Sequence, residues 1–217
     1  MSECLTPEQI VEFISKELGR DMLESRIQIR TEGVKKKENR NVWITISAAA
    51  VHKAAESLMK ISYPHLSCIS GYDKGAKDKN LRVQYNFSLY GGVEDSETMV
   101  IFSLDLPKAN PVLPTITDLM EGTAFTEREK TEYLGITIEG LAPAEHNFFL
   151  PADFPNDVYP LRKDEKRIPD TMVKNLWACG RPENRPPAPI PAPEPKPAPV
   201  AEAAPAPADA AKKEEGA

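Results

Sequence analysis

Hydrophobic residues in the first fifty positions follow first a helical spacing and then an alternating one. Positions 6–9 read Thr-Pro-Glu-Gln, a capping-box sequence with proline at the first helical position, and apolar residues then recur every three or four positions until Gly19. Residues 27–33 and 42–46 instead alternate apolar and polar side chains on either side of a lysine-rich turn. The pattern predicts an amphipathic helix followed by a β-hairpin.

The next sixty positions repeat this change of spacing. Ser47 is the expected N-cap of a second helix, whose apolar face extends to Ile61. A short apolar strand is predicted at 66–69, and residues 82–89 and 99–106 alternate as strands do when one face is buried and the other wet. These elements favour the α+β class, with a mostly antiparallel sheet and helices packed on one face.

Glycine and proline divide the region from 107 to 164. A short helix is predicted at 116–120, and a highly charged helix is predicted to begin at Glu127 and to end at Gly135, with a short alternating strand after it. A long loop segment punctuated by prolines follows. It carries large apolar side chains that would be costly to leave in water, which indicates an interaction surface: Phe148, Phe149, Leu150 and Phe154.

Composition changes sharply at residue 182. The 36 residues from there to the C-terminus contain 11 prolines, 11 alanines and no aromatic residue. Such a segment cannot bury enough apolar surface to offset the entropy of ordering, so we expect it to be disordered and partly polyproline II. The chain is therefore divided into a folded domain, 1–181, which ends in the long loop segment, and a disordered Ala/Pro-rich tail, 182–217.

Charge and cysteine content bear on the class of protein. The net charge is −6, so no broad basic field attracts nucleic acid; the one basic run, at 35–40, is a solvated turn or, alternatively, a phosphate or lipid contact. Three widely spaced cysteines fit a reducing cytoplasm better than a disulfide scaffold. Neither a membrane-spanning apolar run nor an export signal is expected.

Few residues offer catalytic chemistry, since there is no nucleotide-binding glycine motif and the histidines are not at metal-ligand spacing. Glu127, Arg128 and Glu129 stand at consecutive helical positions, about 100° apart, so at least one must face the domain or a partner. They form either an acidic first turn favoured by the helix dipole or a site where Arg128 binds a carboxylate across an interface. A self-sufficient enzyme would draw its acid and base from Glu127, Glu129, Glu132 or His146.

Two motifs in this region carry a family resemblance. Residues 127–136, EREKTEYLGI, resemble the ERExxD signature, two apolar residues and GI of the complex I 30-kDa subunit family. Residues 159–164, YPLRKD, resemble that family's PLRKD motif, and 69–73, ISGYD, are similar to a strand of the family that ends in an aspartate. The two motifs occur in the family's order, and the resemblance covers roughly residues 40–170.

The chain departs from the family pattern at two places. Glu132 stands where the family usually has aspartate, which keeps the carboxylate on a longer arm, and the usual Gly-His-Pro is replaced over 139–143 by EGLAP. The stretch 149–155, FLPADFP, resembles the versions in energy-converting membrane-bound [NiFe] hydrogenases and formate hydrogenlyase. The resemblance therefore points to the hydrogenase branch, with a complex I-type NADH:quinone or deazaflavin-linked dehydrogenase as the alternative.

This resemblance implies a non-catalytic subunit of the hydrophilic arm, docked on the large subunit and supporting electron transfer coupled to ion translocation. It implies no cofactor in this chain, a [NiFe] centre and iron–sulfur clusters in partner subunits, and a peripheral position on the cytoplasmic face of a prokaryotic membrane. Trp177 is a further expected anchor. The expected interface residues are Glu127, Arg128, Glu129, Glu132, Gly135, Phe149, Phe154, Pro160, Leu161, Arg162, Lys163 and Asp164.

Overall fold

The computed structural model describes residues 4–163, apart from 35, 76, 94, 95, 145 and 153. Asp164, Trp177 and the tail lie outside the described residues, and the division at residue 181 stays a prediction. The elements are α1 (Pro7–Leu18), β1 (Met22–Glu32), β2 (Lys37–Ile46), α2 (Val51–Ile61), β3 (His65–Asp73), β4 (Asn80–Leu89), β5 (Thr98–Pro107), β6 (Val112–Pro114), α3 (Thr123–Leu134) and β7 (Thr137–Glu139). None of the described helices is long and apolar enough to cross a membrane.

Five strands form one sheet in the order β1-β2-β5-β4-β3. The pairs β1/β2, β5/β4 and β4/β3 are antiparallel, while β2 and β5, in the middle, are parallel. The expected β1/β2 hairpin and the mostly antiparallel sheet are confirmed. Two short parallel strands, β6 and β7, form a separate two-stranded sheet, and α3 lies between them in the sequence.

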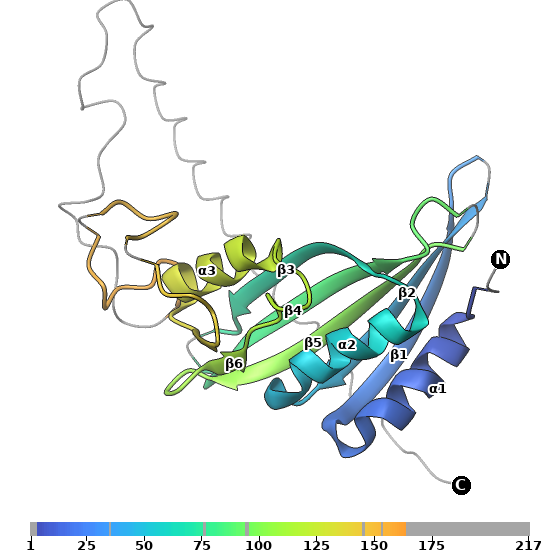
Figure 1. Ribbon diagram of the computed structural model, residues 1–217, viewed down its shortest axis with the longest axis horizontal. Coiled ribbons are helices and arrows are strands. Elements are labelled where there is room, and N and C mark those ends of the chain that lie inside the picture. Colours follow the sequence, from blue (N-terminus) through green and yellow to red (C-terminus); the bar gives the residue numbers. More distant parts are fainter. Residues whose placement is uncertain are drawn as a thin grey trace, which may run out of the picture. The chain divides into compact units, whose positions relative to one another are not determined.

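The core lies between one face of the sheet and the helices. Figure 1 shows α1 and α2 side by side over this face. Val83, Tyr85 and Phe87 of β4 are at most 1% exposed, as the alternation predicted, and each such side chain stabilises the fold by ~1.5–3 kcal/mol. α3 covers the same face beside β3, where a Cβ on Gly71 would lie 2.8 Å from Leu134 Cδ1. This glycine therefore allows α3 to pack closely against the sheet edge.

The start of α1 is the capping box that the sequence predicted. The Thr6 hydroxyl accepts a hydrogen bond from the Gln9 N–H at 3.3 Å, and the Gln9 side chain accepts one from the Thr6 N–H at 2.8 Å. The helix ends at Gly19, whose φ of 58° lies in the left-handed region.

The predicted cap of α2 is wrong. The Ser47 side chain makes no capping hydrogen bond to this helix; its hydroxyl donates to Asp21 Oδ1 at 2.7 Å. A short 3-10 turn, Ala48–Ala50, separates Ser47 from Val51, where α2 begins. A carboxylate distant in sequence competes for the hydroxyl here, which local spacing does not reveal.

The short helix predicted at 116–120 is also wrong. Residues 117–119 form only a turn, in which the Leu119 and Met120 N–H groups both donate to the Ile116 carbonyl oxygen. The hydroxyl of Thr123 donates to the Met120 carbonyl at 2.8 Å, so the chain restarts as α3 at that residue.

Candidate docking surface

Glu127, the first residue of the charged motif, lies inside the fold. Its carboxylate is fully buried and accepts hydrogen bonds from the Thr115 hydroxyl at 2.5 Å and the Ile116 N–H at 3.0 Å. Burial raises the pKa of the Glu127 carboxyl above its ordinary value, and these two hydrogen bonds oppose that shift only in part. Glu127 therefore holds the 115–117 segment against α3 and is not part of the exposed surface.

The raised pKa of Glu127 gives a testable pH dependence. A carboxyl whose pKa is higher in the folded state binds its proton more tightly there, so its contribution to stability is present at low pH and is lost as pH rises. Glu127→Gln mimics the neutral form. We expect this variant to gain stability relative to the parent as the pH rises above about 4, as measured by urea unfolding. Glu8→Gln, at an exposed position, is the control. A difference in unfolding free energy between the parent and Glu127→Gln that did not change with pH would contradict the raised pKa of Glu127.

Glu132 fastens the long loop to α3. Its two carboxylate oxygens accept hydrogen bonds from three consecutive backbone N–H groups, those of Phe148 at 2.6 Å, Phe149 at 2.8 Å and Leu150 at 2.9 Å. Charge-assisted bonds of this kind are among the stronger hydrogen bonds in proteins. The carboxylate that replaces the family's usual aspartate is thus used within this chain, to fix the loop on the helix.

The end of α3 and the PLRKD motif are built against each other. Gly135 has a φ of 66°, and a Cβ at this position would lie 2.5 Å from the Tyr159 ring. The ring therefore packs in direct contact with the backbone of this glycine. The Arg162 Nε donates to the Leu134 carbonyl at 2.7 Å, and its guanidinium lies 4.6 Å from the Tyr159 ring centroid. The positive charge at the carboxyl end of α3 also complements the helix dipole.

Asp73, the last residue of ISGYD, anchors the end of the same loop. It is 1% exposed, and its carboxylate binds Lys108 Nζ at 2.6 Å and accepts from the Lys163 N–H at 2.8 Å and the Gly75 N–H at 2.8 Å. Burial by itself would raise the pKa of Asp73, but Lys108 and the two N–H groups outweigh it and hold the pKa below its ordinary value. The two distant motifs are therefore joined by one carboxylate.

Exposed aromatic side chains gather where this loop meets α3. We call Phe125, Tyr133, Phe148 and Phe149 the aromatic patch. Phe148 packs edge-to-face on both Phe125, at 5.2 Å between ring centroids, and Phe149, at 4.9 Å, while Phe149 lies 6.0 Å from Tyr133. Phe125, Phe148 and Phe149 are 54%, 52% and 40% exposed. Contiguous exposed aromatic groups of this kind are typical of interaction sites.

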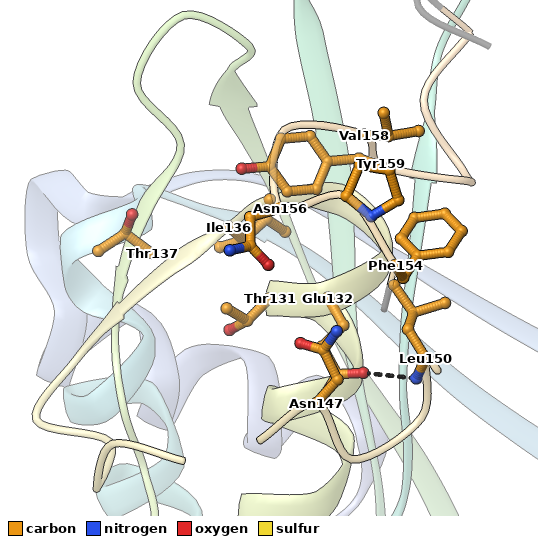
Figure 2. Close-up of a pocket in the computed structure, with 12 residues that line it drawn as sticks. Thr131, Glu132, Ile136, Thr137, Asn147, Leu150, Phe154, Asn156, Val158 and Tyr159 are labelled. Atoms are coloured by element: carbon orange, nitrogen blue, oxygen red, sulfur yellow. Dashed lines mark hydrogen bonds between the residues drawn. The ribbon is translucent and has the colours of Figure 1, made fainter. Parts of the chain in front are cut away.

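A pocket of about 200 Å³ opens between α3 and the loop (Figure 2). Phe154, Leu150 and Val158 contribute its apolar lining, and Glu132 is seen there bonded to the Leu150 N–H. Phe154 is only 9% exposed. In this chain it packs within the loop, and its place in an interface stays a prediction.

The structure thus brings most of the predicted residues to one place but gives them different surroundings. Glu129 is paired with Lys130 at 2.7 Å, Pro160 is half-buried, and Leu161 is 46% exposed. Sequence reasoning missed Phe125 and Tyr133, because single aromatic residues in a highly polar helix give no clear spacing signal.

Comparisons with known proteins bear on this region directly. The model of a family described as the respiratory-chain NADH dehydrogenase 30-kDa subunit matches residues 44–170. The membrane-bound hydrogenase subunit beta of Pyrococcus furiosus is 46% identical over 76 residues, which is 35% of this chain and 43% of that protein. An NADH-quinone oxidoreductase subunit of Chloroherpeton thalassium is 32% identical over 107 residues, 49% of this chain and 41% of that protein.

The chain thus spans less than half the length of these curated relatives. Among solved structures, a chain of an archaeal membrane-bound sulfane sulfur reductase superposes with a TM-score of 0.56 at 18% identity, over 72% of this chain and 83% of that chain. At this identity the match shows a shared fold.

Proposed function

We propose that this chain, which belongs to the family of the respiratory-chain NADH dehydrogenase 30-kDa subunit, is a non-catalytic docking subunit of a membrane-bound energy-converting [NiFe] hydrogenase. In this role it would bind the large subunit and support the hydrophilic arm, in which electron transfer is coupled to ion translocation. The relatives named above are subunits of multi-subunit membrane complexes, which supports such a role for this chain.

The observation that carries the docking role is the fixed, exposed aromatic patch. Three of its rings are between 40% and 54% exposed, although Glu132 and the Tyr159–Gly135 contact hold the loop in place. A surface that is apolar and ordered before binding loses little entropy when a partner covers it. The family motifs are used here to build this surface rather than to bind a substrate.

The hydrogenase branch is favoured by the degree of similarity. Identity to the Pyrococcus furiosus hydrogenase subunit is 46%, against 32% for the NADH-quinone oxidoreductase subunit, although the first match covers fewer residues. The FLPADFP stretch, which resembles hydrogenase versions of the family, points the same way. The alternative is the equivalent subunit of a complex I-type NADH:quinone or deazaflavin-linked dehydrogenase.

In such a complex the redox chemistry would take place in the partner subunits. The [NiFe] centre and the iron–sulfur clusters would belong to the large and iron–sulfur subunits, with no cofactor in this chain. Its place would be peripheral, on the cytoplasmic face of the cell membrane, and it would reach the membrane only through the complex.

Purification of the native complex tests the proposal. We expect a tagged version of the full chain, isolated from its own membranes under anaerobic conditions, to bring down a large hydrogenase-type subunit identified by mass spectrometry. Metal analysis should find nickel in the same fraction. A quinone-site subunit without nickel would move the protein to the dehydrogenase alternative, and recovery of the chain alone would refute the docking role.

A further inference from the structure

Arg128 is the one charged residue of α3 for which the described part of the chain offers no hydrogen-bond or ion-pair partner. Its Nε has no contact with solvent and no acceptor. The side chain as a whole is half-buried, so part of it remains accessible. An occluded N–H without an acceptor destabilises the isolated chain.

The carboxylates nearest to Arg128 in the helix are already in use. Glu127 is bound to Thr115 and Ile116, and Glu129 is paired with Lys130. Glu132, one turn further on, accepts three N–H groups of the loop. No acidic residue of α3 is therefore left to neutralise the guanidinium.

The side of α3 that carries Arg128 also carries part of the aromatic patch. Residues three and four apart lie on the same face of a helix, so Phe125, Arg128 and Glu132 follow one another along one side of α3. The loop spans this side: Phe148 packs on Phe125, while its own N–H is bound to Glu132. Arg128 therefore lies between the two positions of α3 to which the loop is attached, Phe125 and Glu132, and the Phe125 and Phe148 rings are about half exposed.

We infer that the partner that covers the aromatic patch presents an aspartate or glutamate carboxylate to Arg128 from an otherwise apolar surface. The guanidinium is planar and matches a carboxylate through two parallel hydrogen bonds, which lysine cannot imitate. Water is excluded where the rings are covered, so the ion pair becomes stronger on docking. This inference rests on the proposed docking function.

Subunit exchange measures the contribution of Arg128. The full chain carrying Arg128→Met, which keeps the length of the side chain and removes its charge, is assembled into the native complex and displaced by excess parent chain. We expect its dissociation rate to rise at least about thirty-fold, since removing one partner of a buried charge pair acts mainly on dissociation. The dissociation rate of Arg128→Lys should lie between those of the parent and Arg128→Met. Arg20→Met is the matched control, because Arg20 is an exposed arginine that follows α1 in the sequence.

A second experiment identifies the carboxylate without relying on affinity. The amine introduced by Arg128→Lys can be joined by a carbodiimide to a carboxylate in direct contact, and mass spectrometry should find a cross-link from position 128 to one partner aspartate or glutamate. An unchanged dissociation rate for Arg128→Met together with no such cross-link would overturn the inference.

The aromatic residues separate this inference from the docking role itself. If the double variant Phe148→Ser/Phe149→Ser dissociates faster while Arg128→Met does not, the surface docks but meets no carboxylate. If both variants behave as the parent does, the proposed docking surface is wrong.

Discussion

Replacing Asp73 with alanine is expected to lower the free energy of unfolding by ~3–5 kcal/mol, the cost typical of removing one partner from a buried ion pair. The Asp73 side chain is fully buried, and Lys108, whose side chain is 16% exposed, would keep its charge without a counter-ion. The N–H groups of Gly75 and Lys163 would lose their acceptor as well. Urea unfolding of the full chain measures the loss.

The pH dependence of this difference follows from the lowered pKa of Asp73. A carboxyl with a lowered folded-state pKa contributes stability that is complete above its ordinary pKa and disappears as pH falls through the lower value. The difference between parent and Asp73→Ala should therefore shrink below about pH 4. Asp78→Ala is the matched control, because Asp78 pairs with Lys74 at 3.3 Å with a side chain that is 34% exposed, and it should cost less than about 1 kcal/mol. Equal losses for the two variants would contradict the role given to Asp73.

Gly135→Ala is expected to detach the loop from α3 and to cost roughly 2–4 kcal/mol. A φ of 66° is unfavourable for alanine, and the new Cβ would lie 2.5–2.7 Å from atoms of the Tyr159 ring. Tyr159 has to move, and Arg162, which lies over that ring, has to move with it. Hydrogen exchange at the amides of residues 148–150 should accelerate, since these groups bond to Glu132 only while the loop stays in place.

Gly33→Ala separates the two causes of this loss. Gly33 has a similar φ of 74°, but nothing lies within 4 Å of the position of its Cβ. It should therefore show only the backbone cost, about 1–2 kcal/mol, and leave exchange at 148–150 unchanged. If Gly135→Ala behaved in the same way as Gly33→Ala, the contact with Tyr159 would not be needed to hold the loop.

Local sequence signals predicted the parts of the fold that depend on neighbours in the chain. The capping box at 6–9 and the alternation along β4 are confirmed because each is decided within a few residues. Ser47 and the 116–120 turn were mispredicted because their hydrogen bonds go to Asp21 and to residues of α3. No local spacing contains that information.

The candidate surface shows the same limit at a longer range. The motifs located the helix and the loop, but only the structure shows that Asp73 and Lys163, 90 residues apart, meet. The helical spacing required at least one of Glu127, Arg128 and Glu129 to face the domain or a partner, but only the structure shows that Glu127 faces the domain, where Thr115 and Ile116 supply its donors.

The parallel pairing of β2 with β5 determines how the five-stranded sheet is completed during folding. β1 with β2, and β3 with β4 and β5, are two antiparallel groups formed between strands that are consecutive in sequence. The two groups meet at a single seam, where Val42 pairs with Val100. The entropy of closing a long loop is therefore concentrated at this seam, and the sheet becomes continuous only when two locally assembled halves join.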